Sequence, residues 1–279
     1  MSFDSTRFKQ LERAGYDRIG PRYLAAAASR RDLATALLVA ARLAPGQHLL
    51  DLASGPGLLA RAAADAVGKE GLALASDISE GQLRCCPDLA RVAADGEALP
   101  FAAASFDRVL CGLGLMFFPD EQAALLEVRR VLKPDGRFAL SVWGDEDEVP
   151  LVAAALACMR RLLPPPKVAR PSIFRFGAAG ELERRLASAD FRDIEIRRHP
   201  FSIEFPDAAA YWQAFLDLAG GAAESLSRLP AEKQQALAAA VAEELAPHAV
   251  PGGYRLTSTV LIGSGIRFRD QRSGIRDQK

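Results

Sequence analysis

The chain of 279 residues has no net charge, four cysteines and only three histidines. Nucleic-acid binders carry an excess of basic residues, so 35 Lys and Arg against 35 Asp and Glu exclude nucleic acid as an expected partner. The cysteines, Cys85, Cys86, Cys111 and Cys158, form no CxxC pair and no ligand spacing for a metal. We therefore expect no metal site and a reducing, cytoplasmic environment.

Long apolar runs are also absent. No segment approaches the roughly 18 uncharged apolar residues of a membrane span, and residues 1–7 lack the apolar core of a signal peptide. Apolar residues nevertheless make up 49% of the chain, which is enough for a substantial core. We expect one large domain with a sizeable insertion, without an integral membrane segment; the sequence leaves room for a homodimer.

Between residues 45 and 145, short apolar stretches alternate with helix-forming stretches. This alternation predicts an α/β fold, with a parallel sheet covered by helices on both faces. We expect strands at residues 47–52, 72–76, 89–93, 108–112 and 137–143, and helices at 58–67, 80–87 and 119–131.

The segments on either side of this core are predicted to cap it. Residues 1–44 form an N-terminal helical cap, with a helix break at Gly20-Pro21. Residues 146–265 supply the rest of the sheet, with strands at 193–199 and 256–262 that about fifty residues separate. A hairpin would be much shorter, so we interpret residues 200–250 as a helical insertion over the site. The remaining predictions are helices at 151–163, 178–189 and 206–246, and a basic tail at 266–279 with Arg267, Arg269, Arg272 and Arg276.

The most informative segment is residues 51–57, Asp-Leu-Ala-Ser-Gly-Pro-Gly, between a strand and a helix. It has few side chains, so a ligand can approach its backbone closely. Residues 55–60 match the G-x-G-x-x-A pattern of dinucleotide sites, and Asp77 stands where an acid for ribose hydroxyls is expected. Asp51 argues against NAD, because its carboxylate would repel a pyrophosphate. The same carboxylate would attract the ammonium group of S-adenosylmethionine. Both cofactors stay open at this point.

Three further motifs follow in order: residues 94–101 (Ala-Asp-Gly-Glu-Ala-Leu-Pro-Phe), 105–109 (Ser-Phe-Asp-Arg-Val) and 130–137 (Arg-Val-Leu-Lys-Pro-Asp-Gly-Arg). With Asp51 and Asp77 they resemble the class I S-adenosylmethionine-dependent methyltransferases, in the type 11 group related to the ubiquinone and menaquinone C-methyltransferases. The resemblance covers about residues 45–145. It implies S-adenosylmethionine as cofactor and a Rossmann-like, seven-stranded, mostly parallel sheet whose last strand is antiparallel.

The resemblance also implies a set of cofactor contacts. Asp77 would bind both ribose hydroxyls, Ile78 would pack on the adenine, and Asp95 would accept from the adenine amino group. Ala53 replaces a family glycine, which costs about 1 kcal/mol if φ is positive there, and Gln82 stands where the family usually has Met. Two alternatives stay open: Asp51 only caps backbone amides, and the charges at 95 and 97 are solvated. The full predicted set is Tyr23, Asp51, Ala53, Ser54, Gly55, Gly57, Asp77, Ile78, Gln82, Asp95, Gly96, Glu97, Cys111 and Met116.

The reaction implied by the resemblance is an in-line displacement at a sulfonium methyl group, which positioning of the reactants can accelerate. The sequence offers no clear base; His248 and Tyr16 are the candidates for a catalytic role. Aromatic residues concentrated in the insertion favour a hydrophobic or aromatic small-molecule acceptor. Two other hypotheses are a non-catalytic S-adenosylmethionine-binding module and an arsenic methyltransferase, the latter suggested by the cysteines. The expected cleft walls are Leu113, Leu115, Met116, Phe117, Trp143, Phe174, Phe176, Tyr211, Trp212 and Phe215.

Overall fold

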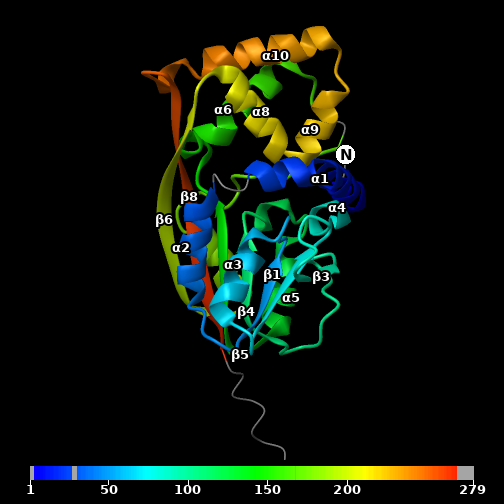
Figure 1. The fold of residues 1–279 in the computed structure, drawn as a ribbon, viewed down its shortest axis with the longest axis vertical. Coiled ribbons are helices and arrows are strands. Elements are labelled where there is room, and N and C mark those ends of the chain that lie inside the picture. The colour runs from blue at the N-terminus through cyan, green and yellow to red at the C-terminus, as the bar shows by residue number, and fades with distance from the viewer. Residues whose placement is uncertain (1–2, 27–29, 167, 269–279) are drawn as a thin grey trace, which may run out of the picture.

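A central sheet organises the molecule, which a computed structural model describes at residues 3–26, 30–166 and 168–268 (Figure 1). In these residues the sheet has eight strands, in the order β3-β2-β1-β4-β5-β8-β6, with β7 paired to β8. The strands are β1 (His48–Leu52), β2 (Leu72–Asp77), β3 (Ala90–Ala93), β4 (Phe106–Gly112), β5 (Leu132–Trp143), β6 (Phe191–Phe205), β7 (Ala249–Val250) and β8 (Gly253–Arg267).

Strand direction confirms the predicted fold class. Strands β1 to β5 run parallel to their neighbours, whereas β8 is antiparallel to both β5 and β6. The sheet is therefore Rossmann-like and mostly parallel with an antiparallel last strand, as expected, and the two-residue β7 is an addition to the predicted seven. Asp51 in β1 pairs with Ala75 of β2 and Leu110 of β4, so three carboxyl ends meet at one edge. Open α/β sheets bind ligands at such an edge.

Helices cover the sheet because their apolar residues recur at helical spacing. Ala60, Ala63 and Val67 are the buried residues of α3 (Leu58–Val67), and their small side chains let the helix lie close to β1 and β2. In Figure 1, α2 (Arg31–Ala41) and α3 lie on one face and α5 (Glu121–Val131) on the other. Helix α7 (Glu181–Ser188) packs on β6 and β8. Both faces are thus covered, as the alternation predicts.

Helix α1 (Ser5–Ala26) passes through Gly20-Pro21 without a break, so that part of the sequence prediction is wrong. Pro21 removes a single backbone bond, and tertiary packing outweighs this loss. On one side α1 lies against α4 (Glu80–Leu83), where a Cβ on Gly20 would come within 2.8 Å of the Gly81 carbonyl oxygen. On its other side α1 contacts the cap helices α8 and α9.

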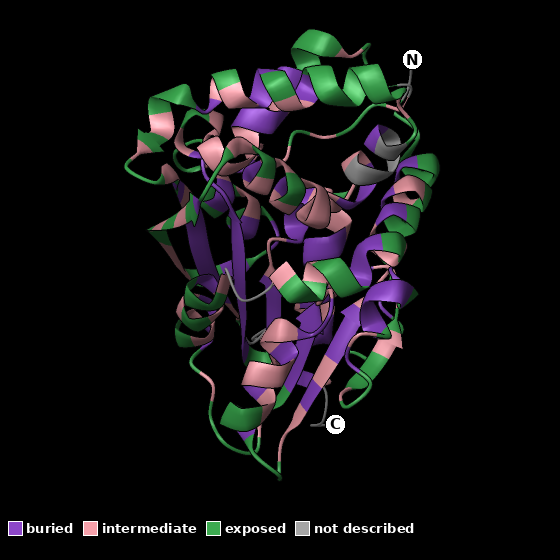
Figure 2. Cartoon of the chain, turned by 45° about the horizontal axis from the view of Figure 1, so that its top comes forward, coloured by how far each residue is buried: buried purple, intermediate pink, exposed green. Residues whose placement is uncertain are grey.

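Four helices form the cap above the sheet: α6 (Pro150–Leu162), α8 (Ala208–Leu218), α9 (Gly220–Ser227) and α10 (Ala231–Glu244). Their second core includes Cys158, Tyr211, Phe215 and Val241. Figure 2 shows this core as purple segments turned inward, with the outer helix surfaces exposed. The predicted stretch 206–246 is thus helical but divided into three helices.

The strands that carry the cap are longer than predicted. Strands β6 and β8 have 15 residues each and stay paired up to Phe205 and Tyr254, next to the cap helices. Arg267, expected in the basic tail, ends β8 and donates to the carbonyl of Leu132. The rest of that prediction, with Arg269, Arg272 and Arg276, lies outside the described residues. Within the described ranges, no helix is both long and apolar enough to cross a bilayer.

Candidate functional site

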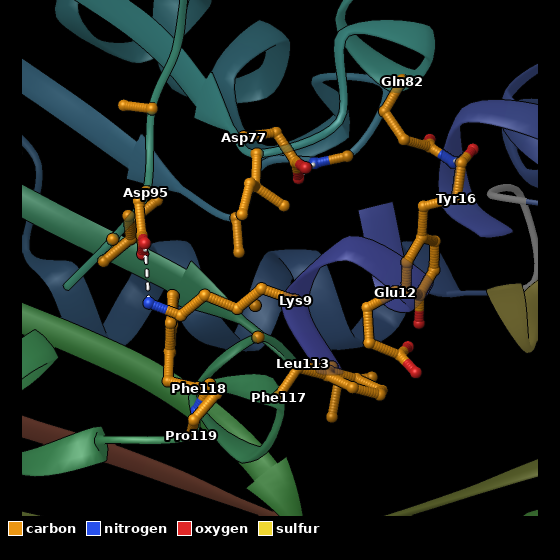
Figure 3. Close-up of a pocket in the computed structure, with 18 of the residues that line it drawn as sticks. Lys9, Glu12, Tyr16, Asp77, Gln82, Asp95, Leu113, Phe117, Phe118 and Pro119 are labelled. Atoms are coloured by element: carbon orange, nitrogen blue, oxygen red, sulfur yellow. Dashed lines mark hydrogen bonds and ion pairs between the residues drawn. The ribbon is translucent and has the colours of Figure 1, made fainter. Parts of the chain in front are cut away.

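A cleft lies where β1, β2 and β4 end, beneath α1; its empty space, including the part open to solvent, is about 770 Å³. Figure 3 shows its walls: α1 contributes one side and the loops after the strands contribute the other. Nine of the residues predicted to bind the cofactor or take part in catalysis line it: Tyr16, Tyr23, Ala53, Gly55, Asp77, Ile78, Gln82, Asp95 and Gly96. A second cleft of about 550 Å³ adjoins it under α2 and includes Ser54. The predicted site is therefore brought together largely at one place.

Asp77, at the end of β2, holds a fixed carboxylate on the cleft wall. Its Oδ2 accepts from the Gly55 amide and its Oδ1 from the Ser79 amide, each at 2.8 Å. Burial raises the pKa of Asp77 to about 6, although the hydrogen bonds from these amides lower it. Around neutral pH the group is an oriented acceptor for a ligand hydroxyl or amine.

The loop after β1 has positive φ angles, which is the condition under which strain was expected at Ala53. Ala53 has φ 53° and Gly55 has φ 54°, both in the left-handed region. Ala53 therefore carries the strain of about 1 kcal/mol that a glycine would avoid. Gly57 also has positive φ, but a Cβ there would lie 2.8 Å from Leu89 Cδ1, so Gly57 serves packing and does not line either cleft.

Asp51 lies behind the loop and is fully buried. Its Oδ2 accepts from the Ala60 amide at 2.9 Å, at the start of α3, and burial raises its pKa to about 8. This geometry matches the capping alternative. Asp51 lines neither cleft, so direct contact with a ligand stays a prediction.

Gln82 presents a carbonyl oxygen to the cleft. Its Nε2 donates to the Tyr16 carbonyl at 3.0 Å, which fixes the side-chain amide. The Oε1 atom is buried and has no hydrogen-bond partner in the described part of the chain. A Cβ on Gly55 would lie 3.7 Å from this oxygen. An orphaned acceptor beside a glycine-rich loop indicates a ligand that donates a hydrogen bond here.

Asp95 and Glu97 are not free, solvated charges, because both pair with Lys9 of α1. The Lys9 ammonium lies 2.6 Å from each carboxylate. Burial lowers the pKa of Lys9, but the two carboxylates raise it more. Beside them, a Cβ on Gly96 would lie 2.4 Å from the ring of Phe118, so only glycine fits. Glu97 faces Lys9 and does not line the cleft.

Three aromatic rings in the cleft wall pack against one another. Tyr16 packs edge-to-face on Tyr23, with ring centroids 6.0 Å apart, and on Phe117 at 5.9 Å. The Tyr23 hydroxyl accepts from Arg30 at 2.6 Å. Burial raises the pKa of Tyr16 well above its ordinary value, so Tyr16 is a hydroxyl rather than a base at neutral pH.

Several predicted residues lie elsewhere. Cys111 and Met116 are buried beneath the cleft floor, and His248 lies on η4 (Ala246–His248) in the cap, outside both clefts. Of the expected walls, Leu113 and Phe117 line the main cleft. The others pack in the two cores and do not line it: Leu115, Met116, Trp143, Phe174, Phe176, Tyr211, Trp212 and Phe215. Hydrophobicity could not distinguish core from cleft.

Sequence reasoning missed Lys9 and Glu12, which line the cleft from α1. Together with Tyr16 they follow an i, i+3, i+7 pattern, which is one helix face. That spacing is the sequence signal from which their position beside Tyr16 could have been predicted.

Residues 50–140 match the protein family described as "Methyltransferase domain". The ubiquinone/menaquinone biosynthesis C-methyltransferase UbiE of Coxiella burnetii is 35% identical to the chain over 133 residues, which are 44% of this chain and 53% of that protein. UbiE of Bordetella avium is 40% identical over 105 residues, or 35% and 41% of the two chains. The chain thus spans about half the length of these curated relatives or less.

The fold as a whole also resembles solved structures. The YcgJ protein of Bacillus subtilis superposes with a TM-score of 0.57 at 17% identity, covering 86% of this chain and all of that one. A putative methyltransferase of Bacillus halodurans gives 0.55 at 19% identity, covering 85% and 99%. At these identities the likeness concerns the fold.

Proposed function

We propose that this protein is an S-adenosylmethionine-dependent methyltransferase that acts on a hydrophobic or aromatic small molecule. The observation that carries the proposal is the Asp77 carboxylate, oriented by the Gly55 and Ser79 amides on the wall of the main cleft. A fixed acid after the second strand of a methyltransferase domain is suited to the two hydroxyls of a ribose.

The polar groups and the free space of the cleft also suit the cofactor. The orphaned Gln82 oxygen offers an acceptor beside Asp77, and Gly55 leaves room where a side chain would stand. Asp95 lies toward the other end of the cleft, where it would receive the adenine amino group (Figure 3). When bound, S-adenosylmethionine supplies a methyl group already activated by its sulfonium.

The acceptor class follows from the walls. Tyr16, Phe117 and Phe118 give the cleft aromatic surfaces, and Leu113 adds an aliphatic one. The relatives named above as quinone-biosynthesis C-methyltransferases support an aromatic, quinone-related acceptor. Among the described residues no histidine lines the cleft. Catalysis would therefore rest on alignment of the acceptor with the methyl group.

The arsenic alternative receives no support from the cysteine positions. Cys111 lies in β4 and Cys158 in α6, far along the chain from the vicinal pair at 85 and 86. The described residues contain no group of three or more His, Cys, Asp or Glu side chains that could hold a metal ion. Methyl transfer from labelled S-adenosylmethionine to an extracted metabolite pool distinguishes an enzyme from a non-catalytic binding module.

The binding step is tested with S-adenosylhomocysteine, which should raise the melting temperature by binding the native state. Asp77→Ala should lose most of that shift. The matched control is Asp88→Ala, which removes an exposed partner of Arg61 and should keep the shift. A full shift in Asp77→Ala would refute the ribose contact, and no shift in the unaltered protein would refute the cofactor.

A further inference from the structure

Glu12 is a buried carboxylate on the cleft wall that the cofactor contacts leave without a role. Only 6% of its surface is exposed, although it lines the cleft. It lies on the same face of α1 as Lys9 and Tyr16, and in Figure 3 its carboxylate lies on the side of the cleft away from Asp95. A buried acid facing a cleft needs a compensating partner.

Its partners are Arg170, whose guanidinium donates to Glu12 Oε1, and the Gly221 amide, whose hydrogen bond also lowers the pKa of Glu12. Space for this pair depends on Gly221 at the start of α9. A Cβ at that glycine would lie 2.3 Å from Glu12 Oε1 and 2.9 Å from the terminal nitrogens of Arg170. Arg170 lies in the segment between α6 and α7 and Gly221 lies in α9, and both are outside the matched methyltransferase segment. Glu12 therefore faces the part of the molecule in which acceptor choice would reside.

The surroundings restrict what Glu12 can bind. The Glu12–Arg170 pair has no net charge, so it offers no attraction specific for a cation, yet a carboxylate oxygen is a strong acceptor for a neutral O–H group. Beside it the rings of Tyr16 and Phe117 pack with centroids 5.9 Å apart. A flat ring that carries a hydroxyl group matches both features.

We propose that Glu12 accepts a hydrogen bond from a hydroxyl group of the methyl acceptor, which is an aromatic hydroxyl compound held beside Phe117. Arg170, in the segment between α6 and α7, orients the Glu12 carboxylate. The proposal deepens the proposed function and rests on it, because it assigns the acceptor end of the same cleft.

The test compares two probes that share one ring system, 1-naphthol and 1-methoxynaphthalene. Titration calorimetry measures both on protein saturated with S-adenosylhomocysteine. We expect 1-naphthol to bind about tenfold more tightly, the effect of one hydrogen bond to a charged group. Glu12→Met should lose this preference while it keeps the thermal shift with S-adenosylhomocysteine. Glu243→Met is the matched control, since Glu243 forms an exposed cap pair with Arg161, and it should keep the preference.

Two outcomes overturn the proposal: equal binding of the two probes to the unaltered protein, or a preserved preference in Glu12→Met. A preserved preference together with a lost thermal shift would assign Glu12 to the cofactor. If Glu12→Met does not fold, Glu12→Gln replaces it; a neutral acceptor should lower the preference several-fold, and an unchanged preference would contradict us. A missing preference with a normal thermal shift refutes this inference alone and leaves the proposed function standing.

Discussion

Lys9 of α1 and Asp95 beyond β3 are joined by an ion pair, with Nζ and Oδ2 2.6 Å apart. The same ammonium contacts Glu97. Asp95 is the residue predicted to receive the adenine amino group, so α1 is tied directly to the predicted adenine end of the cleft. Gln82 ties α1 to the ribose end through the Tyr16 carbonyl. Docking of α1 and binding of the cofactor should therefore be coupled.

Lys9→Met tests this coupling. The variant loses two charge-assisted bonds, and the lysine side chain that makes them is only 21% exposed. We therefore expect the free energy of unfolding in urea to fall by about 1–2 kcal/mol. The affinity for S-adenosylhomocysteine, measured by calorimetry, should fall several-fold because α1 is released. Arg84→Met, which breaks an exposed pair with Glu80, is the control and should cost under about 0.5 kcal/mol. Tighter binding in Lys9→Met would show instead that Lys9 competes with the ligand for Asp95.

Ala53→Gly should stabilise the protein. The left-handed φ of 53° strains alanine but not glycine, so the free energy of unfolding should rise by about 1 kcal/mol. Ala66→Gly is the control, because Ala66 is exposed inside α3 and glycine should cost about 0.5–1 kcal/mol there. Urea denaturation of the two variants should give opposite signs; a loss in both would mean that the loop is not strained.

The fold was predictable where local pattern decides it. Alternating apolar segments placed β1 to β4 within two residues, whereas the predicted strand 193–199 is shorter than β6, which continues through Pro200 to Phe205. Pro200 is tolerated because β6 is an edge strand and needs ladder bonds on one side only. The prediction of a helix break at Gly20-Pro21 is wrong because contacts between α1 and distant helices outweigh local propensity.

The candidate site could be predicted within residues 45–145, the segment that contains the methyltransferase motifs. Asp77 and Gly55 belong to ordered motifs within residues 45–145, and the structure places both on the cleft wall. Lys9 and Glu12 belong to no motif. The spacing shows that they share a helix face. The residue that pairs with Glu12, Arg170, lies more than 150 residues away along the chain. A single sequence carries no local signal for such a contact.

Asp51→Asn should change how stability depends on pH. Burial raises the folded-state pKa of Asp51 to about 8, against about 4 in the unfolded chain. Between these values the folded protein holds a proton that the unfolded chain has released. The free energy of unfolding should therefore fall as pH rises from about 4 to about 8, by at most about 1.4 kcal/mol per pH unit from this group. The asparagine variant should show a flatter profile.

Asp107→Asn is the control of opposite sign for the pH experiment. Burial raises the pKa of Asp107, but the hydrogen bond from Lys133 and the His48 amide lower it below its usual value. Its stabilisation is present above about pH 4 and is lost on acidification, so this variant should leave the slope between pH 5 and 8 unchanged. Urea titrations at each pH measure both profiles, and identical slopes in Asp51→Asn and the unaltered protein would show that Asp51 is ionised when folded.

Gly15→Ala should separate α1 from α9 of the cap. A Cβ at Gly15 would lie 2.4 Å from the carbonyl carbon of Gly220, which is backbone and cannot rotate away, so α1 and α9 must move apart. Alanine gains about 1 kcal/mol in helix propensity, yet overpacking costs about 1–3 kcal/mol, so we expect a net loss of unfolding free energy together with weaker binding of S-adenosylhomocysteine. Gly180→Ala is the control: φ is 78° with no atom within 4 Å of the new Cβ, so backbone strain alone should lower stability while binding stays unchanged. Equal binding by the two variants would mean that the α1–α9 contact does not shape the cleft.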